Sequence, residues 1–500
     1  MDRDMSFWTA DNIKSVIGGI WLARERTPGS ITGVCTDSRV ARQGDVFVAL
    51  RGERMDGHSY LRQAAAAGAR LLILDRAESV NEKWDFDCGI LQVPDTGVAL
   101  LRLGASYRRT LDTTRVIAVG GSNGKTTTCK LLHAVLSRTL RGSVSPKSFN
   151  NAVGVPLTIL AAKRSDQYLI CEVGTNSPGE ITPLADAVSP DIAVITSIGR
   201  EHLEGLGSLR GVIKEESSLM GALRPGGLAV ITAEPPALAD TIRPLLAAAG
   251  GEKPASIVTF GTSPSADLRV GGIVQGPEGT TFVLNEREPY RMPLLGAHNT
   301  LNAAAVIAVA RRLGVPITEI EAGLAGASGA EMRLERVTTG GVRFVNDAYN
   351  SNPESALAAI DTFREAFGSA AGISRRVLIL GDMLELGESA PDLHREVGEA
   401  AAGVFDLVVL VGQLVMFAGE RLARSLGPDC LVPFPDAGHN NAAHIARLLR
   451  PGDAVLLKGS RRMGLERIIG AARESTDRLV EPSPAQSAPS GAGLFDPGAS

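Results

Sequence analysis

Short runs of consecutive apolar residues alternate with alanine-rich or amphipathic segments along most of the chain. In the first region, the apolar runs at 45–50 and 71–74 indicate buried strands, and the alanine-rich stretch 60–69 indicates a helix. A new strand and helix pattern begins soon after residue 112. We therefore predict a small N-terminal α/β domain over residues 1–112.

The second region repeats this alternation around a glycine-rich loop. An apolar strand at 116–119 leads into the sequence GGSNGKTTT, and an amphipathic helix is predicted from about residue 127 to 139. Further strands, separated by helical or loop segments, indicate parallel βαβ units. These strands are predicted at 168–173, 192–197 and 228–232, followed by a polar, strand-rich segment at 257–291 and an alanine-rich helix at 299–313. We place this central parallel-sheet domain at 113–325.

Strands and helices alternate once more in the third region. The predicted strands are 343–346, 376–380, 407–411 and 454–458. This pattern predicts a C-terminal, doubly wound α/β domain over residues 326–474. From residue 475 the composition changes to Pro, Ser, Gly and Ala without apolar periodicity, so 475–500 is predicted to be a disordered tail.

Composition and charge remove several classes of function. The chain has 500 residues, 44% of them hydrophobic, with 51 basic against 55 acidic side chains and a formal net charge of −4. The sequence contains no block of basic residues that would indicate a nucleic-acid partner. No apolar run approaches the roughly 20 residues of a membrane span. The five cysteines show no C-x-x-C spacing, which argues against a disulfide framework or a zinc site. We expect a cytoplasmic monomer.

The glycine-rich loop is the first candidate for chemistry. Its glycines allow backbone N–H groups to converge on phosphate oxygens, Lys125 suits the β and γ phosphates of ATP, and the Thr126 hydroxyl suits magnesium. Val119 stands where the usual phosphate-loop pattern has its first glycine, and a glycine-rich turn without nucleotide is the alternative. The predicted nucleotide-binding residues are Gly121, Ser122, Asn123, Gly124, Lys125, Thr126 and Thr127. A phosphate loop alone leaves kinases, GTPases, motors and ligases open.

Other segments narrow the choice. The loop GGSNGKTTT resembles the T-G-x-N-G-K-T loop of the Mur ligase family, with Gly120 in place of the first threonine. Further segments resemble the family's motifs in the family's order: FNNAVGVPLT (149–158), EVGTNSPGEI (172–181), REHLEGLGSLRGV (200–212), LLGAHNTLNAAA (294–305) and EMRLERV (331–337). The segments TDSR (36–39) and GDVFVALRGERMDGHSY (44–60) are similar to the family's UDP-binding domain. The resemblance covers about residues 15–472.

Three C-terminal segments resemble the D-alanyl-D-alanine-adding members of the family. They are NDAYNSNPES (346–355), LILGDMLELGESAPDLHREVG (378–398) and LLKGSRRMGLERI (456–468). The D-N-P-R or D-N-P-N motif expected of the diamino-acid-adding members is absent. A diamino-acid-adding or folylpolyglutamate-type ligase is the nearest alternative, and a kinase, a regulatory ATPase or a non-catalytic nucleotide-binding homologue would be a different class.

The resemblance implies an ATP-dependent amide ligase of peptidoglycan precursor synthesis. In this family the γ-phosphoryl group of ATP passes to a peptide carboxylate, and an amine attacks the resulting acyl phosphate. The implied substrates are UDP-N-acetylmuramoyl-tripeptide and D-alanyl-D-alanine, with Mg²⁺ as cofactor. Such chemistry depends mostly on positioning and on electrostatic stabilisation of phosphate charge.

The resemblance also implies roles for individual residues. Lys125 and His202 would be catalytic, and Thr126, Glu172 and His202 would surround magnesium. Glu216 is added to both sets by a hypothesis of our own, given below. Asn299 and Asn302 would contact adenine, although Asn299 could instead cap its helix. Arg333 would reach the ATP phosphates and Asp347 the ribose. Ser38 and Arg39 would contact UDP, and Asn150, Asn151, Tyr349 and Asn350 would line the peptide channel. Lys458 and Arg461 could contact substrate or form a solvated basic loop.

Glu216 departs from the family pattern. Family members usually carry a lysine fourteen residues after the loop histidine, carbamylated to an anionic magnesium partner, and this chain has Glu216 there. Lys214 cannot take its place, because two residues along a helix turn a side chain by about 200°. We hypothesise that the Glu216 carboxylate replaces the carbamate. The alternative is a solvated helix glutamate.

Overall fold

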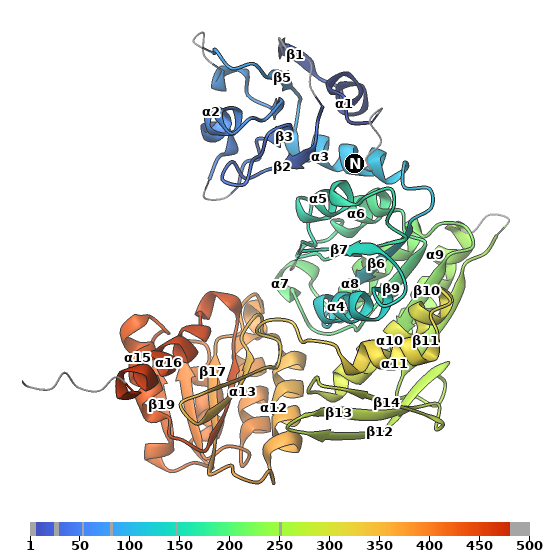
Figure 1. Cartoon of the computed structure of the whole chain (residues 1–500). Helices are drawn as coiled ribbons and strands as arrows, with labels where there is room; N and C mark the ends of the chain where they lie inside the picture. The colour runs from blue at the N-terminus through green and yellow to red at the C-terminus, as the bar shows by residue number, and fades with distance from the viewer. Residues whose placement is uncertain are drawn as a thin grey trace, which may run out of the picture.

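The computed structural model describes residues 7–24, 30–52, 55–80, 84–146, 149–249 and 253–480. Figure 1 shows three α/β units in chain order, each built on its own sheet. The third unit lies beside the lower part of the central one, and the first unit lies apart from the third. In the described part of the chain, no helix has the length and apolar character needed to cross a membrane.

The first unit is a five-stranded sheet in the order β1-β5-β4-β3-β2, parallel except for β1. Its elements are α1 (Ala10–Ile17), β1 (Ile20–Ala23), β2 (Gly33–Cys35), β3 (Asp45–Val48), η1 (Gly57–Tyr60), α2 (Leu61–Ala66), β4 (Leu71–Leu74), η2 (Ala77–Ser79), β5 (Gly89–Gln92) and α3 (Thr96–Arg108). The helix α2 is shorter than the predicted 60–69. It ends before Gly68, whose φ of 97° lies outside the helical region.

The central sheet has nine strands in the order β14-β13-β12-β11-β10-β9-β6-β8-β7. Its strands are β6 (Arg115–Gly120), β7 (Gly142–Val144), β8 (Tyr168–Glu172), β9 (Ile192–Ile195), β10 (Leu228–Thr232), β11 (Ser256–Gly261), β12 (Leu268–Gly276), β13 (Gly279–Leu284) and β14 (Glu288–Met292). The strands β6 to β12 run parallel, as predicted, and β13 and β14 pair antiparallel at one edge. The polar segment 257–291 therefore extends the sheet, first with the parallel strands β11 and β12 and then with the antiparallel strands β13 and β14.

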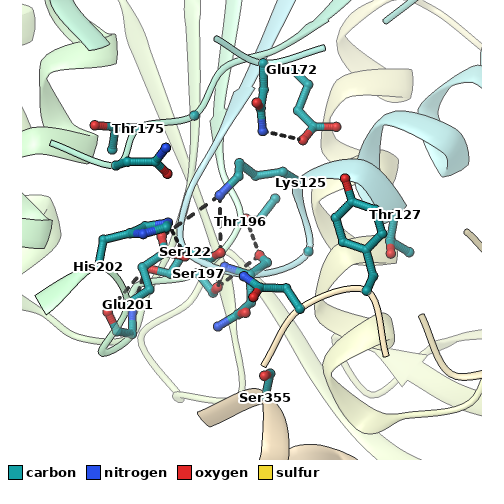
Figure 2. Close-up of a pocket in the computed structure, with 18 of the residues that line it drawn as sticks. Ser122, Lys125, Thr127, Glu172, Thr175, Thr196, Ser197, Glu201, His202 and Ser355 are labelled. Atoms are coloured by element: carbon teal, nitrogen blue, oxygen red, sulfur yellow. Dashed lines mark hydrogen bonds and ion pairs between the residues drawn. The ribbon is translucent and has the colours of Figure 1, made fainter. Parts of the chain in front are cut away.

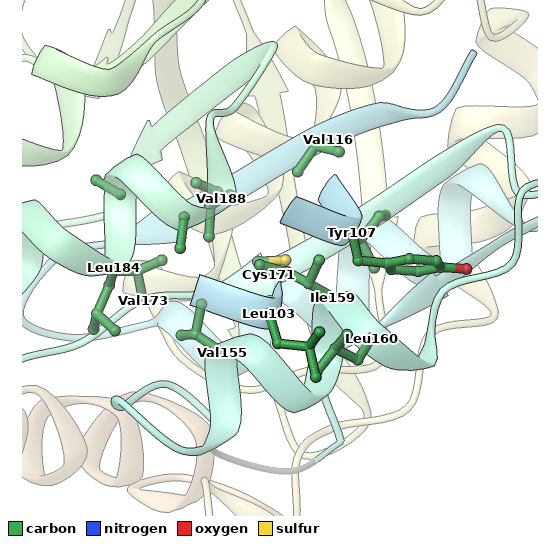
Figure 3. Close-up of a cluster of buried hydrophobic side chains, with 14 of the residues drawn as sticks. Leu103, Tyr107, Val116, Val155, Ile159, Leu160, Cys171, Val173, Leu184 and Val188 are labelled. Atoms are coloured by element: carbon green, nitrogen blue, oxygen red, sulfur yellow. The ribbon is translucent and has the colours of Figure 1, made fainter. Parts of the chain in front are cut away.

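Helices cover both faces of the central sheet. They are α4 (Lys125–Leu136), α5 (Gly154–Ala161), α6 (Ile181–Val188), α7 (Leu203–Leu206), α8 (Leu209–Ser217), η3 (Ser218–Ala222), α9 (Ala237–Ala249), α10 (Ala297–Arg312) and α11 (Ile317–Ala325). On one face α4 packs against α10 and α11. On the other face α5 and α6 pack against α3, as Figure 3 shows. Thus α3, although it precedes residue 112, shares a core with the central sheet.

Buried contacts of Tyr107 and Arg108 explain why α3 stays on the central unit. Tyr107 is fully buried and donates its hydroxyl hydrogen to the Ala162 carbonyl over 2.9 Å. Arg108 donates to the Val188 carbonyl and pairs with Asp191 over 3.0 Å. These bonds join the end of the first unit to loops of the second. They also give the buried polar groups of Tyr107 and Arg108 the hydrogen-bond partners that such groups need.

The third unit is a six-stranded sheet in the order β15-β16-β20-β17-β18-β19, parallel except for β15. Its elements are β15 (Glu335–Thr339), β16 (Val342–Asp347), α12 (Pro353–Phe367), β17 (Arg375–Gly381), η4 (Gly387–Ser389), α13 (Ala390–Ala401), β18 (Leu407–Val411), α14 (Met416–Leu422), η5 (Pro428–Cys430), β19 (Leu431–Phe434), α15 (His439–Leu448), β20 (Asp453–Lys458), η6 (Arg461–Met463) and α16 (Glu466–Val480). Separate apolar cores lie on its two faces, which confirms the doubly wound arrangement.

The last helix corrects one prediction. The segment from 475 was expected to lack structure, yet α16 continues to Val480. The apolar residues Ile468, Ile469 and Ala472 anchor this helix on the sheet, and residues 475–480 prolong the same helix. Composition alone did not reveal this, because Ser475 to Val480 are compatible with helix but not strongly apolar. Residues 481–500 lie outside the described part of the chain.

Candidate active site

A cavity of about 880 Å³ lies between the central and third units, beyond the C-terminal ends of β6, β8 and β9 (Figure 2). Doubly wound sheets bind ligands at this edge. The predicted site residues that line the cavity come from both units. They are Ser122, Asn123, Gly124, Lys125, Thr127, Asn150, Asn151, Glu172, His202, Asn299, Asn302, Arg333, Asp347, Tyr349 and Asn350.

The phosphate loop connects β6 to α4. Gly124 precedes the first residue of α4 with φ of 89°, and a Cβ atom there would lie 2.5 Å from the Asn302 amide oxygen. Gly121 has φ of 113°, and a Cβ atom there would lie 2.5 Å from the Thr196 hydroxyl. Both positions therefore need glycine for backbone conformation and for space.

Lys125 begins α4 and turns back over the loop. Its ammonium donates to the Gly121 and Ser122 carbonyls over 2.5 and 3.2 Å, and it lies 3.9 Å from the Glu201 carboxylate (Figure 2). Burial alone would lower the pKa of Lys125, but Glu201 and nearby Glu216 raise it above its ordinary value. The side chain is thus a cation at the mouth of the loop.

Thr126 and Glu172 form a pair of oxygen groups beneath the loop. The Thr126 hydroxyl donates to Glu172 over 2.9 Å, and the Asn150 amide donates to the other carboxylate oxygen over 3.0 Å. Glu172 is buried at the end of β8, and the Arg333 guanidinium donates to the Thr126 hydroxyl over 3.2 Å. A hydroxyl beside a carboxylate suits a hard cation such as Mg²⁺, which takes few protein ligands when phosphates and waters supply the rest.

His202 lines the same cavity as Glu172, from the loop that leads into α7. It precedes α7 with φ of 48°, and its Nδ1 lies 2.9 Å from the Glu385 carboxylate. Burial lowers the pKa of His202, which favours the neutral form of the ring, although Glu385 opposes this shift. A carboxylate only accepts hydrogen bonds, so Nδ1–H donates to Glu385 and Nε2 keeps its lone pair.

Asn299 and Asn302 face each other on α10. The Asn302 amide donates to the Asn299 side-chain oxygen over 2.9 Å, and the Asn299 amide donates to the Leu295 carbonyl over 2.7 Å. The residue that precedes α10 is Gly296, so Asn299 is not the helix cap. Both amides are buried and line the cavity together, as their spacing of three residues predicts.

Residues of the third unit form the facing wall. The Arg333 guanidinium stacks on the Tyr349 ring, 4.5 Å from its centroid. Lys458 pairs with Asp347 over 3.0 Å and donates to the Asn350 carbonyl over 2.6 Å. Lys458 is fully buried, so the alternative of a solvated basic loop is wrong for this residue.

Comparisons with known proteins agree with this geometry. Sequence models described as "Mur ligase family, catalytic domain", "Mur ligase middle domain" and "Mur ligase, glutamate ligase domain" match residues 30–99, 119–310 and 332–461. The UDP-N-acetylmuramoyl-tripeptide–D-alanyl-D-alanine ligase of Bacillus subtilis is 34% identical over 464 residues, which are 92% of this chain and 97% of that protein. The chain belongs to the Mur ligase family.

Other relatives of this Mur ligase support the same membership. The Escherichia coli ligase of the same name is 32% identical over 459 residues, covering 89% of this chain and 94% of that protein. A crystal structure of MurF from Acinetobacter baumannii has a TM-score of 0.81 at 32% identity and covers 93% of this chain and 99% of that chain. The similarity therefore extends over all three units.

Two predicted UDP-binding residues lie elsewhere in the Mur ligase fold. Ser38 is buried in the first unit and donates to the Gln63 side chain over 3.0 Å. Arg39 is exposed and pairs with Asp37 over 2.7 Å, which lowers the pKa of Asp37 to about 2. Neither residue lines the cavity. Arg461 is also outside it, paired with Glu466.

Glu216 lies behind the phosphate loop. Its side chain is completely buried on α8, and one carboxylate oxygen accepts the Gly121 N–H over 2.7 Å. The other oxygen has no hydrogen-bond partner among the described residues. The alternative of a solvated helix glutamate is therefore wrong. Lys214 is exposed, as the helical geometry predicts. Burial raises the pKa of Glu216, and nearby Lys125 opposes that rise.

Sequence reasoning missed Glu201. Its carboxylate is buried in the cavity wall beside Lys125 and His202, and burial raises the pKa of Glu201 to about 8. Its position directly before the motif histidine was the only signal, and a single glutamate in a loop is usually solvated. Glu354 and His298 also line the cavity and had no predicted role.

Proposed function

We propose that this Mur ligase uses ATP to join D-alanyl-D-alanine to UDP-N-acetylmuramoyl-tripeptide in peptidoglycan precursor synthesis. The observation that carries the proposal is the cavity itself, where a phosphate loop faces a third unit that carries Arg333 and Asp347. The relatives of that name, at 34% and 32% identity over most of both chains, support the choice of substrates. We further propose that the enzyme acts as a cytoplasmic monomer.

ATP would lie between the loop and the third unit. Backbone N–H groups at the start of α4 and the Lys125 ammonium suit its phosphates, because a helix N-terminus attracts anions. The Asn299 and Asn302 amides suit the adenine, and Asp347 suits a ribose hydroxyl. This assignment uses residues that the fold already brings to one cavity.

The residues proposed to hold Mg²⁺ are Thr126 and Glu172, with His202 beside a second ion. The first two fit, because a hydroxyl and a carboxylate lie 2.9 Å apart under the loop. ATP phosphates and water would supply the remaining ligands of the ion, because Mg²⁺ keeps several waters and is usually bound through one or two carboxylates and substrate phosphates. When bound, Mg²⁺ would neutralise phosphate charge and polarise the transferred group.

The chain's own residues would then perform the transfer by charge and position. Lys125 and Arg333 approach the same region from opposite walls and would stabilise the anionic phosphoryl group as it passes to the peptide carboxylate. The acyl phosphate would be attacked by the amine of D-alanyl-D-alanine, with phosphate leaving as the amide bond forms. Enclosure between two units would hold the three anionic reactants together.

The peptide end of the cavity is assigned to Asn150, Asn151, Tyr349 and Asn350. The Asn151 side-chain oxygen accepts the Val153 and Gly154 N–H groups and so fixes the start of α5, while its neighbour Asn150 orients Glu172. Ser38 and Arg39 of the first unit would contact the UDP part. UDP-N-acetylmuramoyl-tripeptide would then extend from the first unit to the cavity.

The deciding experiment uses the purified enzyme with ATP, Mg²⁺ and UDP-N-acetylmuramoyl-tripeptide. Candidate amines are offered singly, namely D-alanyl-D-alanine, D-alanine, L-lysine, meso-diaminopimelate and L-glutamate, and products are identified by mass spectrometry. We expect phosphate release and a new amide only with the dipeptide. Equal ligation of L-lysine or meso-diaminopimelate would refute the substrate assignment, and phosphate release without any amine would indicate an ATPase.

A further inference from the structure

The loop 199–202, between β9 and α7, touches both the cavity and the third unit. Gly199, Glu201 and His202 line the cavity, whereas Arg200 reaches across to the third unit. Figure 2 shows His202 and Glu201 together on this loop. One short loop thus connects the reaction site to the neighbouring unit.

Arg200 binds two helices of the third unit at once. Its Nε donates to Glu354 at the start of α12 over 2.5 Å, and its terminal nitrogens donate to both oxygens of Glu396 on α13 over 2.9 and 3.2 Å. The two carboxylates raise the pKa of Arg200, so its charge is fixed. A guanidinium suits this task because its planar fork can hold two acceptors in set directions.

These groups are partly shielded from water. The side chains of Arg200, Glu354 and Glu396 are 35%, 33% and 40% exposed. Fully exposed ion pairs contribute little to stability. A partly shielded arrangement of three charged groups with several hydrogen bonds contributes more than a single surface pair. Its geometry requires the two units to stay together.

A second contact joins the same loop to the same unit. The Glu385 carboxylate, in the loop after β17, accepts the His202 Nδ1–H over 2.9 Å. His202 and Glu385 have φ of 48° and 64°, a backbone region that side chains other than glycine rarely adopt. Such conformations persist where surrounding contacts hold them, and they concentrate at functional sites.

We propose that Arg200 is a positioning residue that clamps the third unit onto loop 199–202, so that Glu385 holds the His202 ring for the reaction. The carboxylate fixes the Nδ1–H tautomer and leaves the Nε2 lone pair available, as outer carboxylates do for reactive or metal-binding histidines. The expected effect on the reaction rests on the proposed ligase function. The contact between Arg200 and the third unit does not depend on that function.

The test is a double-mutant cycle with Arg200→Ala, Glu396→Ala and the double variant. Each single substitution should lower kcat about tenfold with little change in the KM for ATP, and the double variant should be no worse than the worse single one. Small-angle scattering without substrates should show a larger radius of gyration in all three. Arg200→Lys, which keeps the charge but loses the fork, should recover part of kcat.

The matched control is Arg395→Ala. Arg395 is a neighbour of Glu396 on α13 with similar exposure, and its partners Asp392 and Glu420 both belong to the third unit. This variant should keep the wild-type kcat and radius of gyration. Melting temperatures of all variants establish that each one is folded.

Glu385→Ala tests the link to His202. It should lower kcat in the wild-type background and have little further effect in the Arg200→Ala background. Additive effects of Arg200→Ala and Glu396→Ala, or an unchanged radius of gyration, would overturn the clamp. If the wild-type enzyme fails to ligate D-alanyl-D-alanine, the proposed function fails, and the scattering comparison still decides the clamp.

Discussion

Replacing Lys125 by Ala removes the cation closest to the phosphate loop. The ammonium now lies 3.9 Å from the Glu201 carboxylate and donates to two loop carbonyls. A unit charge about 4 Å from an anionic oxygen contributes roughly 4 kcal/mol at an effective dielectric of about 20. Much of this acts on the transferring phosphoryl group, so we expect a loss of at least about 3 kcal/mol in transition-state stabilisation, or over a hundredfold in rate.

The assay measures phosphate release and ligated product at saturating ATP, with the UDP-linked tripeptide and D-alanyl-D-alanine. Folding should survive, because the buried Glu201 and Glu216 can take up protons once their neighbouring cation is gone. Lys130→Ala is the control, since Lys130 lies on the same helix, does not line the cavity, and donates to the Gly329 carbonyl over 3.4 Å. Ligation by Lys125→Ala at near the wild-type rate would refute the assignment of the phosphate loop.

Two further outcomes are expected. Glu216→Gln keeps an acceptor for the Gly121 N–H but removes the carboxylate, so turnover should fall strongly without loss of melting temperature. Removal of bicarbonate should not slow the native enzyme. A bicarbonate requirement, or full activity of the variant, would show that this carboxylate does not replace a carbamate. A chain ending at Val480 should retain the wild-type activity and melting temperature, since the Pro- and Ser-rich residues 481–500 offer little apolar surface to bury, and a large loss would show that they dock.

The three-unit α/β fold could be predicted because parallel strands are buried on both faces. The runs at 71–74, 168–171 and 407–411 are continuously apolar and buried, so they stand out in the sequence. More buried and more exposed positions alternate along β14, at the edge of the central sheet, and along its neighbour β13, and no local pattern tells which sheet these strands join. The packing of α3 on the central sheet is likewise set by contacts far apart in the chain.

The sequence predicted those site residues that belong to a motif. It was less informative for residues whose role depends on burial. Lys125, Glu172 and His202 meet at one cavity as expected. The pairing of Arg200 with Glu396 joins residues almost two hundred positions apart, and no spacing rule relates them. Glu216 was expected near magnesium, which stays a prediction, and its carboxylate accepts the Gly121 N–H of the loop backbone. The pattern of apolar residues shows which side of a helix faces inward, but it does not show which backbone group a side chain on that side contacts.

The contact of Glu216 also explains how the phosphate loop presents its donors. Three successive N–H groups are already used: Gly121 bonds to Glu216, and Ser122 and Asn123 bond to the backbone carbonyl and the hydroxyl of Ser197. The first N–H groups of α4 have no acceptor within their own helix. We therefore propose that phosphate binding relies on the start of α4 together with Lys125. In this proposal, Glu216 and Ser197 hold the preceding turn so that this helix end faces the cavity, and Glu216, which does not line the cavity, supports phosphate binding from behind the loop.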